Sequence, residues 1–199
     1  MTQCEMTFPH RYGTQEYPEL PGSGWGSIPV HYFPRATTRT EHGGIWLKVT
    51  PSSGTPWVGV FDFGYKQPPA ISMIVTTPNP DRLCVVSAGA AYLVNANQPS
   101  NWEQLHLFPV LDVRLILDLQ LIVFSTFHRL AALGAEGVVW ESPRVCWDDL
   151  QIDRCDADRI EGTGFDPTSA SEKMPFSVDP RTGRSLLPTP RSIDGKPIW

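Results

Sequence analysis

Three of the five histidines, His10, His31 and His42, precede residue 50, and the carboxylates Glu41 and Asp62 lie nearby in the sequence. Imidazole and carboxylate groups bind transition metals and transfer protons near neutral pH. The expected strand spacing does not force these residues together, so a surface or hydrogen-bonded structural histidine is the favoured interpretation. The sequence therefore predicts neither a metal site nor a cofactor.

A second set of candidates is aromatic. Residues 30–35 combine aromatic, histidine and arginine side chains, which is an interface-like composition. Trp25 is flanked by glycines, which favours its exposure. Together with Asp62, these side chains suggest an alternative pocket for a small ligand or a carbohydrate, or for a hydrolase. The members of this alternative pocket are Trp25, His31, Tyr32, Arg35 and Asp62.

The acidic residues are concentrated in one part of the chain. Residues 141–166 contain eight Asp or Glu and three Arg, and the whole chain has a net charge of -5. Neighbouring Asp148 and Asp149 would point to opposite faces of a strand, which disfavours an acid–base pair. Residues 153–158 depart from the calcium loop of an EF-hand. An acidic surface attracts a basic partner, and the expected partner-binding residues are Asp148, Asp149, Asp153, Asp156 and Asp158.

Several classes of protein are disfavoured. The sequence contains no nucleophile elbow, phosphate-binding loop or HExxH motif. Nucleic-acid binding is not expected, because only four of the 16 cationic residues are Lys and none of them form a run. The four cysteines include no CxxC pair, which argues against zinc, and Cys84 and Cys146 are expected to be reduced and buried. Charges interrupt the apolar region 111–133, and no signal peptide is present, so we expect a cytoplasmic protein.

The elements that would position these residues are expected to be short strands. The 16 Gly and 20 Pro disfavour long helices. Apolar residues occupy every second position from Leu111 to Leu121, the period of a strand, and a turn is expected near residues 118–120. Residues 127–133 are ambiguous. The other segments rich in β-branched and aromatic residues are 28–33, 45–49, 57–61, 71–76, 83–87, 91–95, 138–140, 150–154 and 159–163.

Similar apolar residues recur every 37 to 38 positions, in the pairs Val86–Val123, Trp102–Trp140 and Ile122–Ile160. The last unit ends at residues 176–184, where Asp179 enters a tight turn and Gly183 supplies a positive φ. This hairpin resembles the outer hairpin of β-propeller repeats, and the resemblance covers residues 45–187. It implies a small or incomplete propeller. The Gly-His and Trp-Asp signature of the commonest propeller class is missing, and a two-sheet β-sandwich is the alternative.

We therefore expect an all-β protein of antiparallel hairpin units. Residues 1–27 are expected to form an irregular arm, residues 28–187 a single domain, and residues 188–199 an exposed tail. The favoured function is a non-enzymatic protein-interaction domain that binds a basic partner through its acidic loops, as an inhibitor or immunity-type protein would. The alternative is the small-ligand or carbohydrate pocket, with or without hydrolase activity.

Overall fold

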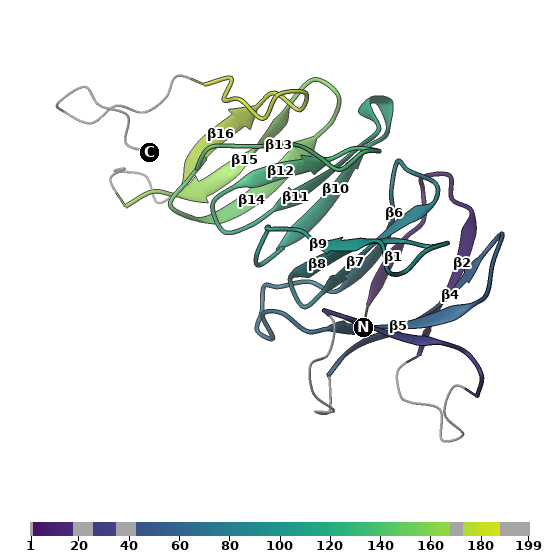
Figure 1. The fold of residues 1–199 in the computed structure, drawn as a ribbon. Coiled ribbons are helices and arrows are strands. Elements are labelled where there is room, and N and C mark those ends of the chain that lie inside the picture. The colour runs from purple at the N-terminus through teal and green to yellow at the C-terminus, as the bar shows by residue number, and fades with distance from the viewer. Residues whose placement is uncertain (1, 18–25, 35–42, 168–172, 188–199) are drawn as a thin grey trace. The chain divides into compact units, whose positions relative to one another are not determined.

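The computed structural model describes residues 2–17, 26–34, 43–167 and 173–187, and these residues form strands joined by turns (Figure 1). The one helical element among them is the 3-10 turn η1, Leu117–Leu119. The chain divides into two compact units, residues 1–110 and 111–199, which we call unit 1 and unit 2. Across the described residues, we find no helix with the length and hydropathy needed to cross a bilayer. The expected tail 188–199 lies outside the described ranges.

Unit 1 contains two sheets. The five-stranded sheet has the order β1-β6-β7-β8-β9, and the four-stranded sheet has the order β2-β4-β5-β3. Two of the pairs, β1–β6 and β3–β5, are parallel, and the others are antiparallel. The strands are β1 Gln3–Glu5, β2 Tyr12–Tyr17, β3 Val30–Phe33, β4 Gly44–Pro51, β5 Trp57–Asp62, β6 Met73–Thr76, β7 Arg82–Ser87, β8 Ala90–Asn95 and β9 Trp102–Gln104.

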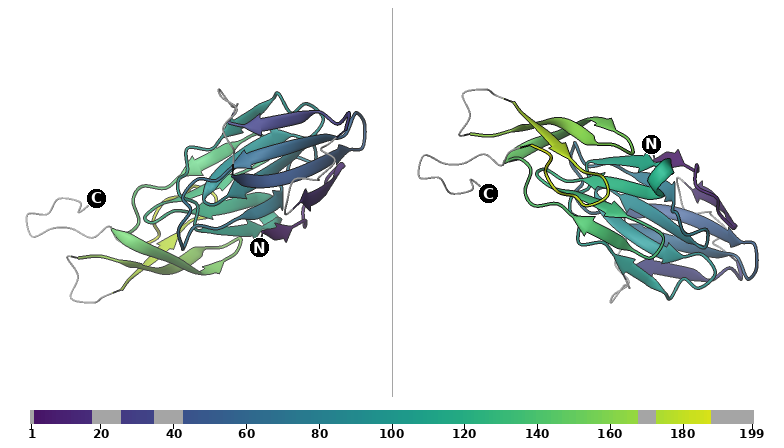
Figure 2. Two further views of the ribbon diagram at one scale, coloured as in Figure 1. Left: turned by 90° about the horizontal axis from the view of Figure 1, so that it is seen from below. Right: turned by 90° about the horizontal axis from the view of Figure 1, so that it is seen from above.

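Unit 2 also contains two sheets, and every pair in them joins consecutive strands in antiparallel fashion. The first sheet consists of β10 Asp112–Ile116, β11 Leu121–Ser125, β12 Leu130–Leu133 and β13 Val138–Glu141. The second consists of β14 Asp148–Cys155, β15 Ile160–Phe165 and β16 Met174–Val178. Figure 2 shows the strong twist of the β14–β16 sheet, whose strands are coloured green to yellow.

The 37-to-38-residue spacing corresponds to this succession of sheets. Val123 lies in β11 and Ile160 in β15, each the second strand of its sheet in unit 2. Trp102 and Trp140 lie in β9 and β13, each the last strand of a four-strand antiparallel meander. The prediction of an all-β protein built from antiparallel hairpin units is confirmed. So is the turn after β10, where Gln120 adopts a left-handed conformation with a φ of 53°.

One expectation requires correction, and one open point is resolved. The proposed irregular arm contains β1 and β2, because β2 pairs with β4 over six residues and buries Tyr12, while β1 pairs with β6. The ambiguous segment 127–133 contains β12, whose four residues are all buried. The region 28–187 contributes to both compact units.

Each unit has its own apolar core. In unit 1, the core lies between the two sheets and includes Phe33, Leu47, Phe61 and Tyr92, all nearly inaccessible to solvent. In unit 2, the core includes residues from β11, β12, β15 and β16 and contains Trp140. The Nε1–H of Trp140 donates to the carbonyl oxygen of Pro180 at 2.8 Å, so the turn after β16 covers this ring.

Candidate functional site

Strand β14 carries three of the five predicted partner-binding aspartates, Asp148, Asp149 and Asp153, and is an edge strand of its sheet. Its pairing with β15 is interrupted twice, between Asp148 and Gln151 and between Ile152 and Arg154. Asp149, with a φ of 52°, and Asp153 lie within these irregularities, whereas Leu150 and Ile152 are buried. A β-bulge re-aims side chains. As a result, Asp148 and Asp149 are both exposed instead of alternating between the two faces.

The five predicted aspartates differ in what they bind. Asp156 holds its own turn, because its Oδ1 accepts hydrogen bonds from the backbone N–H of Asp158 at 2.9 Å and of Arg159 at 3.1 Å. Its Oδ2 accepts a hydrogen bond from Arg154 Nε at 2.5 Å. These bonds lower the pKa of the Asp156 carboxyl. Asp156 was predicted only as a partner-binding residue, and these bonds give it a structural role in its own turn.

The remaining aspartates are more available. Asp149 lies 3.9 Å from the ammonium of Lys173, and its Oδ1 accepts a hydrogen bond from Gln151. Asp148 accepts a hydrogen bond from the backbone N–H of Asp149. Within the described part of the chain, the carboxylates of Asp153 and Asp158 form no ion pair. Both side chains are exposed to solvent.

Two large apolar side chains lie beside Asp148. Trp147 is 52% exposed and precedes Asp148, and Phe165, which pairs with Asp148 in the register of β15, is 39% exposed. The backbone N–H of Trp147 donates to the carbonyl oxygen of Phe165 at 2.8 Å, which fixes the two residues side by side. The guanidinium of Arg144 lies 5.0 Å from the Trp147 ring centroid. We call Trp147, Asp148, Asp149, Asp153 and Phe165 the β14 surface.

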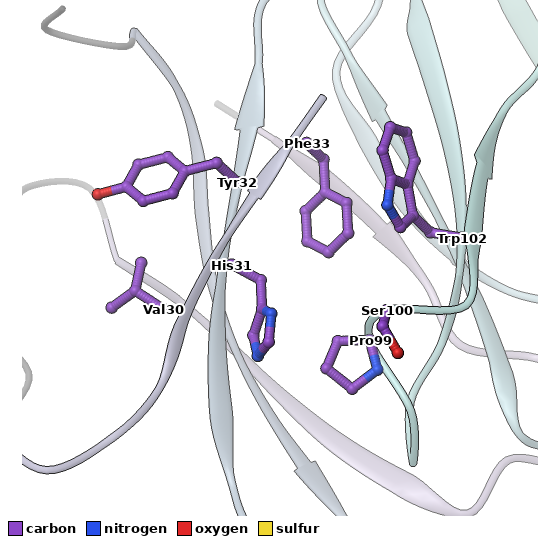
Figure 3. Close-up of a pocket in the computed structure, with 7 residues that line it drawn as sticks. All are labelled: Val30, His31, Tyr32, Phe33, Pro99, Ser100 and Trp102. Atoms are coloured by element: carbon purple, nitrogen blue, oxygen red, sulfur yellow. The ribbon is translucent and has the colours of Figure 1, made fainter. Parts of the chain in front are cut away.

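A pocket of about 290 Å³ lies in unit 1, between the edge strand β3 and the segment that leads into the edge strand β9 (Figure 3). Figure 3 shows His31 and Phe33 on the side of β3 that faces Trp102, while Val30 and Tyr32 project to the other side. The lining residues are Val30, His31, Tyr32, Phe33, Pro99, Ser100 and Trp102.

The wall of this pocket is a network of rings. Phe33 stacks on Phe61 with centroids 4.7 Å apart and meets Trp102 edge-on at 5.3 Å. The His31 ring packs edge-on against Trp57 at 5.7 Å, and burial lowers the pKa of this imidazole. Trp57 is in turn fixed by a hydrogen bond from its Nε1 to the carbonyl oxygen of Ala96 at 2.8 Å. The ring positions are therefore set by the core of unit 1.

The structure places only two members of the predicted alternative pocket in the lining of this pocket. His31 and Tyr32 line it, whereas Asp62, at the end of β5, does not. Trp25 and Arg35 lie outside the described residues, as do Glu41 and His42. Trp102, which was not among the predicted pocket residues, is partly buried against the core of unit 1 and also lies in the pocket wall.

Metal-ligating side chains do not converge in the described ranges, since no group of three or more His, Cys, Asp or Glu there has the geometry to hold an ion. All four cysteines are free thiols, and Cys84 and Cys146 are buried as expected. Burial raises the pKa of both thiols to about 12. The arrangement therefore favours packing over thiolate chemistry at these positions.

Comparisons with known proteins give only a weak structural similarity. No protein family model matches the sequence. No curated protein shows significant sequence similarity to it. Among solved structures, the chain is similar to the crystal structure of the N-terminal domain of Nup159, a β-propeller domain, with a TM-score of 0.40 and 10% sequence identity. The match covers 94% of this chain and 54% of that one, so this chain spans about half of its length.

Proposed function

We propose that this protein is a recognition domain that binds a basic partner protein through the β14 surface. The observation that carries the proposal is the pairing of two exposed apolar rings with exposed carboxylates on one edge strand. Trp147 is 52% exposed and Phe165 is 39% exposed, Asp148 and Asp149 follow Trp147 directly in the chain, and the exposed Asp153 lies further along the same strand. Tryptophan is enriched among the residues that dominate binding energy at interfaces.

The charges of the surface specify the chemistry of the partner. Asp153 makes no ion pair with any described residue, and the contact between Asp149 and Lys173 is long at 3.9 Å. Exposed ion pairs of this kind contribute little stability, so a partner's Lys or Arg displaces Lys173 at small cost. Complementary charge then steers the encounter and accelerates association at low ionic strength. The finer role that we propose is that of an inhibitor or immunity-type partner of a basic protein.

The edge position of β14 also supports docking. The described residues of β14 pair with β15 on one side only. Outside this pairing, the backbone N–H of Leu150 donates to the carbonyl oxygen of Phe127 at 3.2 Å, and the carbonyl oxygen of Ile152 accepts a hydrogen bond from Arg114 at 3.5 Å, so β14 is not an open template for strand pairing. The surface therefore presents side chains, rather than a continuous backbone ladder, to its partner.

The test begins with capture of a stoichiometric partner from the native host by the full chain, followed by binding measurements on the purified pair. We expect Trp147→Ala and the charge reversals Asp149→Lys and Asp153→Lys to weaken binding, and added salt to weaken it further. Glu136→Lys is the matched control, since Glu136 is exposed in the β12–β13 turn of the same unit. The proposal fails if no stoichiometric partner is captured, or if the reversals on β14 weaken binding no more than Glu136→Lys.

A further inference from the structure

The pocket of unit 1 has a wall suited to a neutral ligand. None of its seven lining residues is Asp, Glu, Lys or Arg. Its titratable group with a pKa near neutrality is His31, and burial lowers that pKa, which favours the uncharged imidazole. A charged ligand would lose hydration there without meeting an opposite charge, and that loss is costly.

Three polar side chains of the wall have hydrogen-bonding capacity left. Within the described residues, the imidazole of His31, the hydroxyl of Ser100 and the indole N–H of Trp102 form no hydrogen bond to another protein group. By contrast, Trp57 in the core of unit 1 and Trp140 in the core of unit 2 both donate from Nε1 to a carbonyl oxygen at 2.8 Å. In Figure 3 the indole nitrogen of Trp102 is directed toward Phe33 and the space beside it.

The mixture of donors and acceptors decides between ligand classes. Trp102 Nε1–H is a donor only, a neutral imidazole has one donor and one acceptor nitrogen, and a hydroxyl serves as both. Proline-rich peptides also bind aromatic grooves, but a run of prolines has no N–H to satisfy the acceptor nitrogen of His31. Sugar hydroxyls are both donors and acceptors, and the C–H face of a sugar ring packs on an aromatic ring.

From these observations we infer that the pocket formed by His31, Phe33, Ser100 and Trp102 binds a neutral sugar ring. Its volume of about 290 Å³ lies at the lower end of small-molecule pockets, roughly 300–1,000 Å³, and suits one ring rather than a long oligosaccharide. Among the described residues, the wall includes no carboxylate, whereas most glycoside hydrolases use two. The inference is therefore recognition of the sugar by unit 1, and it does not depend on the β14 surface of unit 2.

The experiment is an NMR titration of the full-length, ¹⁵N-labelled protein with the methyl glycosides of glucose, galactose, mannose and N-acetylglucosamine. The Trp102 indole signal is assigned as the one that disappears in Trp102→Phe. We expect at least one glycoside to shift this signal in a saturable manner. Ser100→Ala, at an exposed position, should weaken that binding by about 2- to 10-fold through loss of one hydrogen bond.

Phe108→Ala is the matched control, because it removes an exposed ring of unit 1 that does not line the pocket, and it should leave the glycoside affinity unchanged. Trp102→Ala lacks the indole signal, so its titration is followed through the backbone amide signals of residues 30–33 and 100–101, and we expect no saturable shift. If this variant does not fold, His31→Phe, which keeps a ring at that position, replaces it. The inference is overturned if none of the four glycosides shifts the Trp102 signal. It is equally overturned if binding survives in Trp102→Ala or His31→Phe, or if an oligoproline peptide shifts the signal and the glycosides do not.

Discussion

Replacement of Trp147 and of Trp140 by alanine separates recognition from packing within unit 2. The two residues are seven positions apart in the sequence, but Trp147 is 52% exposed and Trp140 is 8% exposed. Trp140 also donates a hydrogen bond to the Pro180 carbonyl, whereas Trp147 contacts Arg144 at the surface. We expect Trp140→Ala to reduce stability and Trp147→Ala to reduce partner binding.

The magnitudes follow from the buried area. A tryptophan side chain buries about 200 Å² when fully enclosed. Trp140→Ala therefore removes roughly 180 Å² of buried surface, which lowers the free energy of unfolding by about 4–5 kcal/mol at ~25 cal/mol per Å². Truncation of Trp147 removes roughly half as much, and about 2 kcal/mol is an upper limit because unfolded chains also bury apolar surface. At the interface, loss of a dominant tryptophan costs about 2 kcal/mol or more, which is roughly a 30-fold weaker complex.

Urea unfolding followed by far-UV circular dichroism measures the first effect, and titration calorimetry with the captured partner measures the second. Trp140→Phe serves as a milder variant if Trp140→Ala does not fold. Equal destabilisation by the two alanine variants would refute the reasoning, because Trp147 would then be a packing residue. So would a Trp147→Ala variant that binds the partner with wild-type affinity.

Three further outcomes are expected. An added Cβ at Gly183 (φ +69°) would lie 2.5 Å from Cε3 of the Trp140 ring, whereas at Gly26 (φ +60°) it would meet nothing within 4 Å. Gly183→Ala should therefore cost about 2–4 kcal/mol and Gly26→Ala about 1 kcal/mol in denaturant unfolding, and equal costs would contradict the clash. Because hydrogen bonds lower the folded-state pKa of Asp156 below its usual 3.8, its contribution to stability is present above that pH and is lost as the pH falls further. Thermal melts on both sides of pH 3.8 should thus show a smaller acid-induced loss for Asp156→Asn than for the wild type, and an unchanged loss would argue against this linkage. Burial raises the pKa of Cys84 to about 12, while Cys4 is exposed. Iodoacetamide should therefore modify Cys4 in the native protein and Cys84 only after unfolding. Mass spectrometry distinguishes the two sites, and equal rates of modification at Cys4 and Cys84 in the native protein would refute the burial of Cys84.

The strands that sequence analysis predicted best are those whose partners are close in the chain. The alternation from Leu111 onward and the polar residues at 118–120 identify β10, its turn and β11 from local signals alone. The hairpin after β16 was equally predictable, because Asp179 accepts hydrogen bonds from the N–H of Arg181 and the hydroxyl of Thr182 in that turn, and Gly183 has the positive φ expected of it. Short strands β1 and β2 lack such signals, since Gln3 pairs with Met73 and Tyr12 with Pro51.

The candidate sites were predictable only in part, for the same reason. The acidic composition of β14 is visible in the sequence, but the bulge that exposes both Asp148 and Asp149 depends on its pairing with β15. Gly164 in β15 is part of this dependence. A Cβ at position 164 would lie 2.4 Å from the Cβ of Cys146, so a larger residue there would clash with Cys146. In the pocket, His31 was a candidate, whereas Ser100 comes from a turn about 70 residues away whose position depends on the core of unit 1.

The pairing of β1 with β6 affects the order in which the chain can fold during synthesis. The β1–β6 ladder cannot form until Met73, the partner of Gln3, has left the ribosome. Strands β10 and β11, in contrast, span only about fifteen residues and can pair as soon as these have emerged. Strand β1 thus stays without its partner while about 70 further residues are added, and until then its edge is available to other chains. Crowded translation should consequently threaten the early half of this protein more than the later half.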